Sequence, residues 1–473
     1  MPNNISYKDT ATRVVEEDGI FYRYIFEEYQ QEYDHLMQSG LYLALTEKGL
    51  LISHQEVDAN PEAQQESQPQ QESNVYKKLL PDQISFQSYP FEWSYGQWRI
   101  VVYAYLQINK IALAHGMVLK DATPFNFYFE KGKPVLLDTS SFSFFKEGTP
   151  WIAYRQFCTE LLSPLALMYY NGERWARLSM SHLRGMPLNF VSKQLPFKSW
   201  FNSNCLLHIH IHARYANGEA GTNDTKNAKD IYNSKKEQKG FSKEKLLSLF
   251  GMIECSLEKC KQAYPFEKHW LTYYQKDIAS EIYLNNKEAI VKEWLDKIKP
   301  ASVLDLGANT GRFSIIASEY TERVIALESD TKCIDAINQA TIDLNKTIYA
   351  ARIDLAETTP NMGVLEKEYS SIYTRAKSTM VMALAITHHL YINDLLSFVK
   401  ISSMLNKFSE QYVITEFVPA NDEKVQLLMK DKQKEYPEYS EEAFIKAIEQ
   451  NFTIKERKVI NGSERIIYLL EKH

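Results

Sequence analysis

Residues 302–314 read SVLDLGANTGRFS, a short apolar segment that runs into a glycine-containing turn and the start of a helix. Gly307 and Gly311 let the backbone approach a bulky ligand closely, because a side chain at either position would collide with it. Asp305, at the end of the apolar segment, provides a carboxylate that can accept hydrogen bonds from an ammonium group, directly or through water. The stretch therefore predicts a ligand-binding turn that follows a buried strand.

Downstream of this turn, short apolar segments alternate with helical spans. The expected strands lie in RVIALES, TIYAARIDL, TMVMALAI and YVITEFV. Such alternation predicts a doubly wound and mostly parallel sheet, an α/β fold of the Rossmann-like kind. The last stretch, FTIKERKVINGSERIIYLLEK, contains an Asn-Gly pair and predicts an antiparallel hairpin that closes one edge of the sheet.

Acidic side chains end the first three of these expected strands. Asp305 is followed by Glu328 in VIALESD and by Asp354 in AARIDLA. Ligands of such folds bind beyond the carboxyl ends of the strands, where Glu328 can accept both hydroxyls of a ribose and Asp354 an adenine amino group. A glycine-rich turn alone would also fit a dinucleotide site. The spacing GxxxG after an acid, in place of GxGxxG, and the three acids in order favour an adenosyl ligand.

The segment from about residue 285 to the end resembles the class I S-adenosylmethionine-dependent methyltransferases. The resemblance implies S-adenosylmethionine as cofactor and the following cofactor-binding residues: Asp305, Gly307, Asn309, Gly311, Glu328, Asp354 and Leu355. Asn309 is a departure, because many members carry a glycine there. Through segments such as YPFEWS, LKDATPFN and ITEFVP, nearly the whole chain also resembles a family of bacterial methyltransferases that includes nodulation-associated proteins.

The candidate catalytic residues follow the expected fourth and fifth strands. Transfer of a methyl group from a sulfonium is an in-line displacement, so the protein mainly positions the acceptor and removes its proton. His388 and His389 in ALAITHHL are the expected base, and Glu416 in ITEFVP is a second choice. The alternative is that one histidine only packs against the following helix. No (N/D)PPY motif follows the fourth strand, so we expect a small polar acceptor, a saccharide or specialised metabolite, and no DNA base.

Residues 117–142, MVLKDATPFNFYFEKGKPVLLDTSSF, carry a second pattern. Asp121, Asn126 and Asp138 match the spacing of the catalytic loop and metal-binding strand of protein kinases. The stretch resembles part of a kinase-like lobe within an α+β region, but we recognise neither a glycine-rich loop nor a strand lysine upstream. Residues 40–53 are expected to form a remnant hairpin. Three alternatives stay open: a platform for a substrate or protein partner, an active kinase in a bifunctional protein, and a chance match.

Composition sets the remaining expectations. The 473 residues carry a formal net charge of −6, which argues against a general affinity for nucleic acid. The N-terminus lacks the features of a signal peptide, no apolar stretch is long enough to span a bilayer, and the five cysteines form no CxxC pair, so we expect a cytoplasmic protein without a membrane partner. In LHIHIHA, an extended chain would place His208, His210 and His212 on one face; buried strand histidines are more common than a metal site, so no metal is expected.

The expected organisation has five parts. They are an N-terminal segment (1–78) with a disordered loop (56–73), a kinase-like lobe (79–213), a polar linker (214–246), a helical connector (247–290) and the methyltransferase domain (291–473).

Overall fold

The computed structural model describes residues 3–4, 11–58, 75–214, 242–260, 281–432, 436 and 438–473. It divides into two compact units: unit 1 comprises residues 1–84, 89–128 and 133–266, and unit 2 comprises 85–88, 129–132 and 267–473. The polar stretches 56–73 and 214–246 lie largely outside the described residues. The expected boundary at residue 291 falls inside helix α11, Glu281–Ile298.

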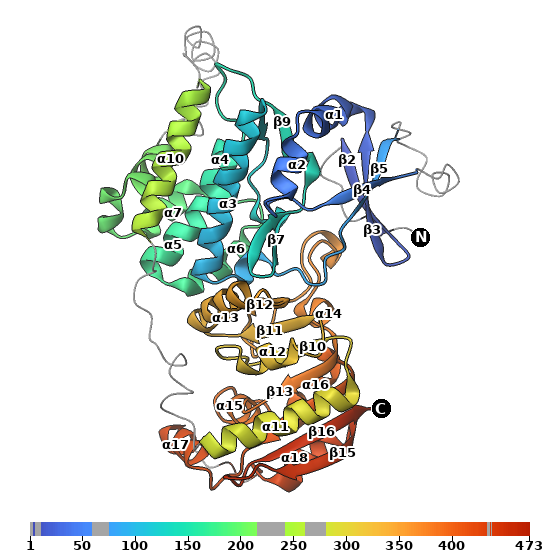
Figure 1. Ribbon diagram of the computed structural model, residues 1–473. Helices are drawn as coiled ribbons and strands as arrows, with labels where there is room; N and C mark the ends of the chain where they lie inside the picture. Colours follow the sequence, from blue (N-terminus) through green and yellow to red (C-terminus); the bar gives the residue numbers. More distant parts are fainter. Residues whose placement is uncertain are drawn as a thin grey trace. The chain divides into compact units, whose positions relative to one another are not determined.

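Unit 2 is built on a seven-stranded sheet with the order β12-β11-β10-β13-β14-β16-β15 (Figure 1). All pairings from β12 to β14 are parallel, whereas β16 pairs antiparallel with both β14 and β15. This confirms the expected mostly parallel sheet with an antiparallel hairpin at its edge. The strands are β10 Val303–Leu306, β11 Val324–Glu328, β12 Ile348–Arg352, β13 Ser378–Ala383, β14 Ser409–Phe417, β15 Phe452–Val459 and β16 Ile466–Lys472.

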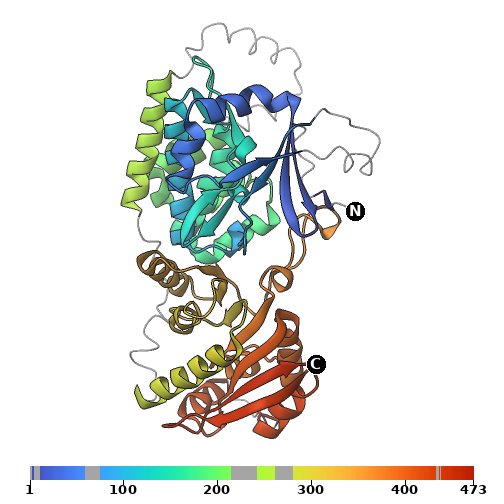
Figure 2. The same cartoon turned by 45° about the vertical axis from the view of Figure 1, so that its right-hand side comes forward.

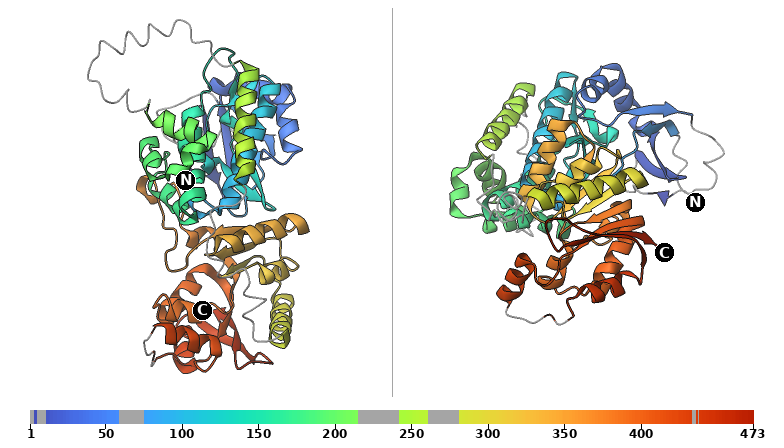
Figure 3. Two further views of the ribbon diagram at one scale, coloured as in Figure 1. Left: turned by 90° about the vertical axis from the view of Figure 1, so that its left-hand side faces the viewer. Right: turned by 60° about the horizontal axis from the view of Figure 1, so that its bottom comes forward.

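Helices cover both faces of this sheet, because successive residues of a buried strand point to opposite sides. Val303 and Val324 belong to one hydrophobic cluster with α11, α12 (Arg312–Ala317) and α13 (Thr331–Leu344). Leu304 and Ile325, one residue further along each strand, belong to the opposite cluster. The helices that contribute to it include α15 Thr387–Ile392, α16 Phe398–Phe408 and α18 Glu441–Ile448. Helix α11 lies across the strands on the face of the sheet that carries the first cluster, as Figure 3 also shows.

Unit 1 contains a five-stranded antiparallel sheet near its N-terminus, with the order β1-β2-β3-β5-β4 (Figure 2). Its strands are β1 Asn3–Asn4, β2 Thr12–Glu17, β3 Ile20–Phe26, β4 His54–Val57 and β5 Val75–Pro81. Asp18 and Gly19, both with positive φ, form the tight turn between β2 and β3. Asp-Gly between two strands is a strong hairpin signal. This hairpin was not among the elements expected from the sequence.

The helical part of unit 1 is centred on α3, Tyr95–Ala114. Ser94 begins α3 with a capping box, in which its hydroxyl accepts from the Gln97 amide at 3.1 Å. Helix α10, Lys243–Lys259, packs along α3, and Lys110 forms an ion pair with Glu254 between them. A hairpin follows further along the chain, formed by β7 Phe127–Glu130 and β8 Lys133–Leu136.

Two local expectations in unit 1 are wrong. Residues 41–46 form helix α2 and no hairpin, because Leu41 and Leu45, four residues apart, are both buried. Residues 205–211 form a π-helix and no strand. The imidazole of His210 is bonded to the hydroxyls of Ser192 and Ser199 at 2.8 and 2.7 Å, so hydroxyl groups rather than a metal satisfy it. The described residues contain no group of three or more His, Cys, Asp or Glu side chains that could hold a metal ion.

Among the helices of the described residues, none combines the length and the apolar character needed to cross a membrane.

Candidate active site

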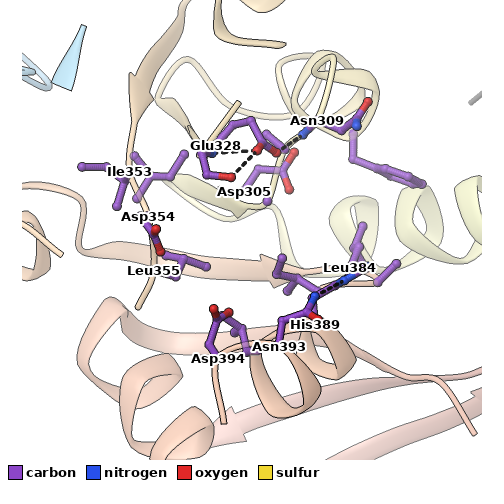
Figure 4. A pocket seen from close by; sticks show the side chains of 18 of the residues that line it. Asp305, Asn309, Glu328, Ile353, Asp354, Leu355, Leu384, His389, Asn393 and Asp394 are labelled. Atoms are coloured by element: carbon purple, nitrogen blue, oxygen red, sulfur yellow. Dashed lines mark hydrogen bonds between the residues drawn. The ribbon is translucent and has the colours of Figure 1, made fainter. Parts of the chain in front are cut away.

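A pocket opens at the carboxyl ends of β10, β11, β12 and β13 in unit 2 (Figure 4). Helices α11, α12 and α15 also contribute to its wall, together with Asn393 and Asp394 after α15. Seven of the residues expected from the sequence line it: Asp305, Gly307, Asn309, Glu328, Asp354, Leu355 and His389. The other three, Gly311, His388 and Glu416, do not.

The turn after β10 exposes main-chain atoms to the pocket at Gly307, which has no side chain. Gly307 has a φ of 69°, and a Cβ added there would lie 3.0 Å from Cδ1 of Ile386. Asn309 and Ala385, which also line the pocket, hold the left-handed conformation with φ values of 49° and 53°. Such backbone costs about 1–3 kcal/mol per residue and gathers at binding sites. Gly311 serves packing instead, because an added Cβ would lie 2.9 Å from Cγ1 of Ile337 on α13.

Asp305 is a buried carboxylate at the floor of the pocket. Burial raises the pKa of Asp305 to about 6, although a hydrogen bond from Ser314 and the nearby Lys287 ammonium act in the opposite direction. The hydroxyl of Ser314 donates to its Oδ2 at 2.7 Å. A buried carboxylate that is costly to ionise gains most from a cationic ligand, so this group suits an ammonium.

Glu328 ends β11 and is held by the backbone around it. Its Oε1 accepts from the amides of Ser329 and Asp330 at 2.6 and 3.0 Å, and from the Ser329 hydroxyl at 3.1 Å. Its Oε2 accepts from the amide of Asn309 at 2.9 Å. A carboxylate oxygen has two lone pairs, so Oε2 keeps an acceptor position for a ligand hydroxyl. Figure 4 draws Glu328 beside Asp305 and Asn309.

Asp354 and Leu355 follow β12 at the side of the pocket. Asp354 is exposed, and its Oδ1 accepts from the amide of Ala356 at 2.9 Å. Leu355 and Ile353 are buried apolar neighbours. An exposed carboxylate flanked by apolar side chains suits a flat heteroaromatic ring that carries an amino group.

His389 of α15 lines the pocket opposite the strand ends, together with Asn393 and Asp394, which follow the helix (Figure 4). Burial and the Arg465 cation lower the pKa of His389 to about 4, so the imidazole is neutral at pH 7. The amide nitrogen of Asn393 lies 3.3 Å from its Nδ1. Because an amide nitrogen only donates, neutral His389 carries its proton on Nε2 in this arrangement. His388 is buried away from the pocket, only 1% exposed.

Glu416 lies behind the pocket wall in a network of buried charges. It is fully buried, forms an ion pair with Lys287 at 2.6 Å, and accepts from the Tyr283 hydroxyl at 2.7 Å. Although burial acts against it, Lys287 and Arg465 hold the pKa of Glu416 below its usual value. Lys287 and Tyr283 line the pocket and were not among the residues expected from the sequence. A signal exists, because Lys287 interrupts the apolar stripe of α11 that contains Leu284, Val291 and Leu295.

The kinase-like residues of unit 1 lie close together. Asn126 Nδ2 donates to Asp121 at 3.4 Å. Burial and the neighbouring Asp138 raise the pKa of Asp121 to about 7. Asp138 itself forms an ion pair with Arg23 of β3 at 2.5 Å, and its Oδ1 also accepts from the Ser140 amide at 2.8 Å. Arg23 was not among the residues expected from the sequence.

Comparisons with known proteins add the following. No protein-family model matches the chain. Nodulation protein NoeA of Rhizobium meliloti (strain 1021) is 28% identical over 404 residues, which is 85% of this chain and 82% of that protein. N-methyltransferase NodS from Bradyrhizobium japonicum WM9 is a similar solved structure, with 10% identity and a TM-score of 0.32, over 41% of this chain and 99% of that one.

A second similar structure is magnesium protoporphyrin IX methyltransferase (ChlM) from Synechocystis PCC 6803 with bound SAH. Its identity is 17% and its TM-score 0.31, over 42% of this chain and 89% of that one. The fold of unit 2 is recognised from its own topology. Five parallel strands are followed in the sheet by the antiparallel strand β16, which lies between β14 and β15, and acids and a glycine turn lie at the strand ends. By these features, unit 2 has the fold of the S-adenosylmethionine-dependent methyltransferases.

Proposed function

We propose that this chain transfers a methyl group from S-adenosylmethionine to a small polar acceptor, a saccharide or specialised metabolite. One observation carries the proposal: Asp305, Glu328 and Asp354, at three neighbouring strand ends, line one pocket beside a turn of bare backbone. The surroundings of each of these three acids suit a different part of this cofactor. A buried acid suits the ammonium, an acid with one open acceptor position suits a ribose hydroxyl, and an exposed acid between apolar side chains suits the adenine.

The chemistry divides between the cofactor and the chain. When bound, S-adenosylmethionine supplies a methyl group activated by its sulfonium. Asp305, Glu328 and Asp354 hold the ends of the ligand, and Gly307 leaves room for it. On the other wall, His389 and Asn393 orient the acceptor, and His389 accepts its proton where the acceptor has one to lose. To accept at Nε2, His389 needs its proton on Nδ1, with the Asn393 amide turned so that its oxygen faces that nitrogen.

The acceptor is found by following the methyl group. The purified full chain is incubated with deuteromethyl-labelled S-adenosylmethionine and with the small-molecule and protein fractions of a bacterial lysate, and both fractions are searched by mass spectrometry. We expect label in a small polar metabolite, and much less of it with the Asp305→Asn variant at a limiting cofactor concentration. Label in protein alone would instead favour a protein methyltransferase that uses unit 1 for docking. Equal label with and without Asp305 would contradict the site.

Binding of S-adenosylhomocysteine is expected to weaken as the pH falls from 7 to 5. The pKa of Asp305 is about 6, so the carboxyl group becomes neutral over this range and stops attracting the ligand ammonium. The affinity should fall by up to about tenfold per pH unit below that pKa. Calorimetric titrations at pH 7, 6 and 5 measure it, with Asp305→Asn as the control whose weak binding should not change with pH. A wild-type affinity independent of pH would contradict the role of Asp305.

The alternative of a bifunctional kinase rests on Asp121, Asn126 and Asp138 in unit 1. Magnesium prefers near-octahedral oxygen ligands, and Arg23 already neutralises the carboxylate of Asp138. We therefore expect no magnesium-dependent binding of ATP to the wild-type chain. Calorimetry with ATP, with and without Mg²⁺, checks this. Binding that needs Mg²⁺ and disappears in Asp138→Ala would support the bifunctional alternative.

A further inference from the structure

One acid of the pocket lies apart from the three at the strand ends. Asp394 is on the opposite wall, two residues after the end of α15, and its side chain is exposed. Figure 4 shows it beside Asn393, with its carboxylate pointing toward the strand ends. Under the proposed function this wall, which also carries His389, receives the methyl acceptor. The charge of Asp394 therefore bears on the chemical class of the acceptor.

The backbone that carries Asp394 is held in place by its neighbours. The amide of Asn393 donates to the carbonyl oxygen of His389 at 2.8 Å. The hydroxyl of Tyr436 donates to the carbonyl oxygen of Ile392 at 3.1 Å. These bonds fix the main chain on both sides of Asn393 before a ligand binds, so that little main-chain entropy is lost on binding.

The pocket offers little positive charge to a negatively charged acceptor. Among the described residues of its wall, Lys287 is the only lysine or arginine. Its ammonium lies 2.6 Å from Oε2 of Glu416, which compensates its charge. His389 is neutral at pH 7, because its pKa is about 4. A phosphate or carboxylate on the acceptor would meet the carboxylate of Asp394, and like charges brought together in a binding site cost affinity.

An ammonium and a hydroxyl can both donate a hydrogen bond to Asp394, but they differ in how readily they lose a proton. The pKa of an alkyl ammonium is about 10, as in lysine, whereas that of water, the simplest hydroxyl compound, is about 16. The neutral imidazole of His389 is a weak base. It therefore suits an acceptor that releases its proton easily, which is the ammonium.

Methyl transfer to an amine also moves charge in a direction that a carboxylate favours. The ammonium first loses one proton, through His389 to solvent. The nitrogen lone pair then forms a bond to the methyl carbon as the bond between that carbon and the sulfonium sulfur breaks, with its electron pair left on sulfur. The positive charge passes from sulfur to nitrogen. A carboxylate beside the nitrogen stabilises the ammonium on binding and the charge that develops during transfer.

We infer that the acceptor is an amine carried by a small polar molecule, and that Asp394 is the residue that selects it. This inference rests on the proposed function and narrows its saccharide or specialised metabolite to a molecule that is a cation at pH 7.

The first test sorts acceptors by charge. The small-molecule fraction of a bacterial lysate is separated by ion exchange at pH 7 into cationic, neutral and anionic pools. Each pool is incubated with the purified full chain and deuteromethyl-labelled S-adenosylmethionine, and mass spectrometry measures the label. We expect label in the cationic pool, about tenfold or more above either other pool, the ratio expected from one hydrogen bond to a charged group.

The pools separate this inference from the function on which it rests. Label mainly in the neutral or the anionic pool would overturn the amine and leave the proposed function standing. No label in any of the small-molecule pools would overturn both.

The second test asks whether Asp394 makes the selection. For the labelled amine, Asp394→Asn is expected to lower kcat/KM about 10- to 100-fold, mainly through a higher KM, because a charged hydrogen bond is weakened. Asp394→Glu should restore part of the loss. The affinity for S-adenosylhomocysteine, measured by calorimetry, should stay within about twofold. Asp343→Asn, which removes an exposed acid of α13 outside the pocket, is the matched control and should behave as wild type.

Two results would overturn the role of Asp394. An Asp394→Asn chain with the wild-type KM for the amine would assign the selection to another residue. Equal losses for the amine and for S-adenosylhomocysteine would place Asp394 on the cofactor side of the pocket. If Asp394→Asn does not fold, as checked by its thermal transition, the KM of Asp394→Glu for the amine decides, and a wild-type value would contradict a carboxylate placed against the ammonium.

Discussion

Replacing Asp305 by asparagine is expected to weaken the binding of S-adenosylhomocysteine about 100-fold while making the ligand-free protein more stable at pH 7. The loss of affinity follows from the removal of one partner of a buried charge pair with the ligand ammonium, which typically costs about 2–5 kcal/mol. Calorimetric titration measures it. Such opposite effects on binding and stability distinguish a functional carboxylate from a structural one.

The gain in stability follows from the sign of the pKa change. Burial raises the pKa of Asp305 from 3.8 to about 6 in the folded protein. A carboxyl group with a raised folded-state pKa destabilises the protein above that pKa, and the penalty disappears as the pH falls from about 6 towards 3.8. Two pKa units correspond to about 3 kcal/mol, of which the uncharged asparagine should recover about 1–3 kcal/mol.

The thermal transition that S-adenosylhomocysteine shifts in the wild-type chain reports on unit 2. In Asp305→Asn this transition should lie a few degrees higher at pH 7, and the difference should shrink towards pH 4. Ser314→Ala is the matched control, because it removes the hydroxyl that donates to Asp305 and leaves the charge in place. That variant should be less stable than wild type. An Asp305→Asn protein that is less stable at pH 7 and still binds the ligand tightly would contradict the assignment.

Replacing His389 by leucine is expected to lower kcat by about 10²- to 10⁴-fold, the usual contribution of general acid–base catalysis, with little change in the affinity for S-adenosylhomocysteine. His389 lines the pocket on the wall opposite Asp305, so its removal affects the acceptor and not the cofactor. The measurement is steady-state kinetics on the acceptor identified by methyl labelling. Because the pKa of His389 is about 4, kcat at saturating cofactor should not depend on its protonation above about pH 5.

His388→Leu is the matched comparison for this prediction. The centroid of the His388 ring lies 4.2 Å from that of the His389 ring, but His388 is buried and does not line the pocket. Burial, with the His389, Arg465 and Lys287 charges, keeps the pKa of His388 well below its usual value. We expect this substitution to change stability and to leave kcat nearly unchanged. A large loss of kcat in His388→Leu with none in His389→Leu would exchange the roles of the two residues.

The fold of unit 2 was predictable because its parallel strands are short apolar runs that alternate with helices, a pattern that few architectures share. The acids at the strand ends were predictable for the same reason, since their place in the pocket follows from the topology. The apolar stripe of α11 marks Lys287 as an unusual position, but it does not place Lys287 in the pocket, because this helix precedes the first strand and no spacing rule connects Lys287 to Asp305. Only the fold brings the two together.

The errors in unit 1 have a different origin. In LHIHIHA the alternation of polar and apolar residues has the period of a strand, yet hydroxyl partners from Ser192 and Ser199 stabilise a helical arrangement of the same residues. Side-chain partners of this kind are distant in sequence and override local periodicity. The β2–β3 hairpin, in contrast, carried a readable signal in Asp18 and Gly19 that was overlooked.

The measurement that tests the central claim most directly is a calorimetric titration of the full chain with S-adenosylhomocysteine at pH 7, beside Asp305→Asn. We predict saturable binding at one site per chain in the wild type and about 100-fold weaker binding in the variant. A folded wild-type chain that shows no binding, or a variant that binds as tightly as the wild type, would contradict the account.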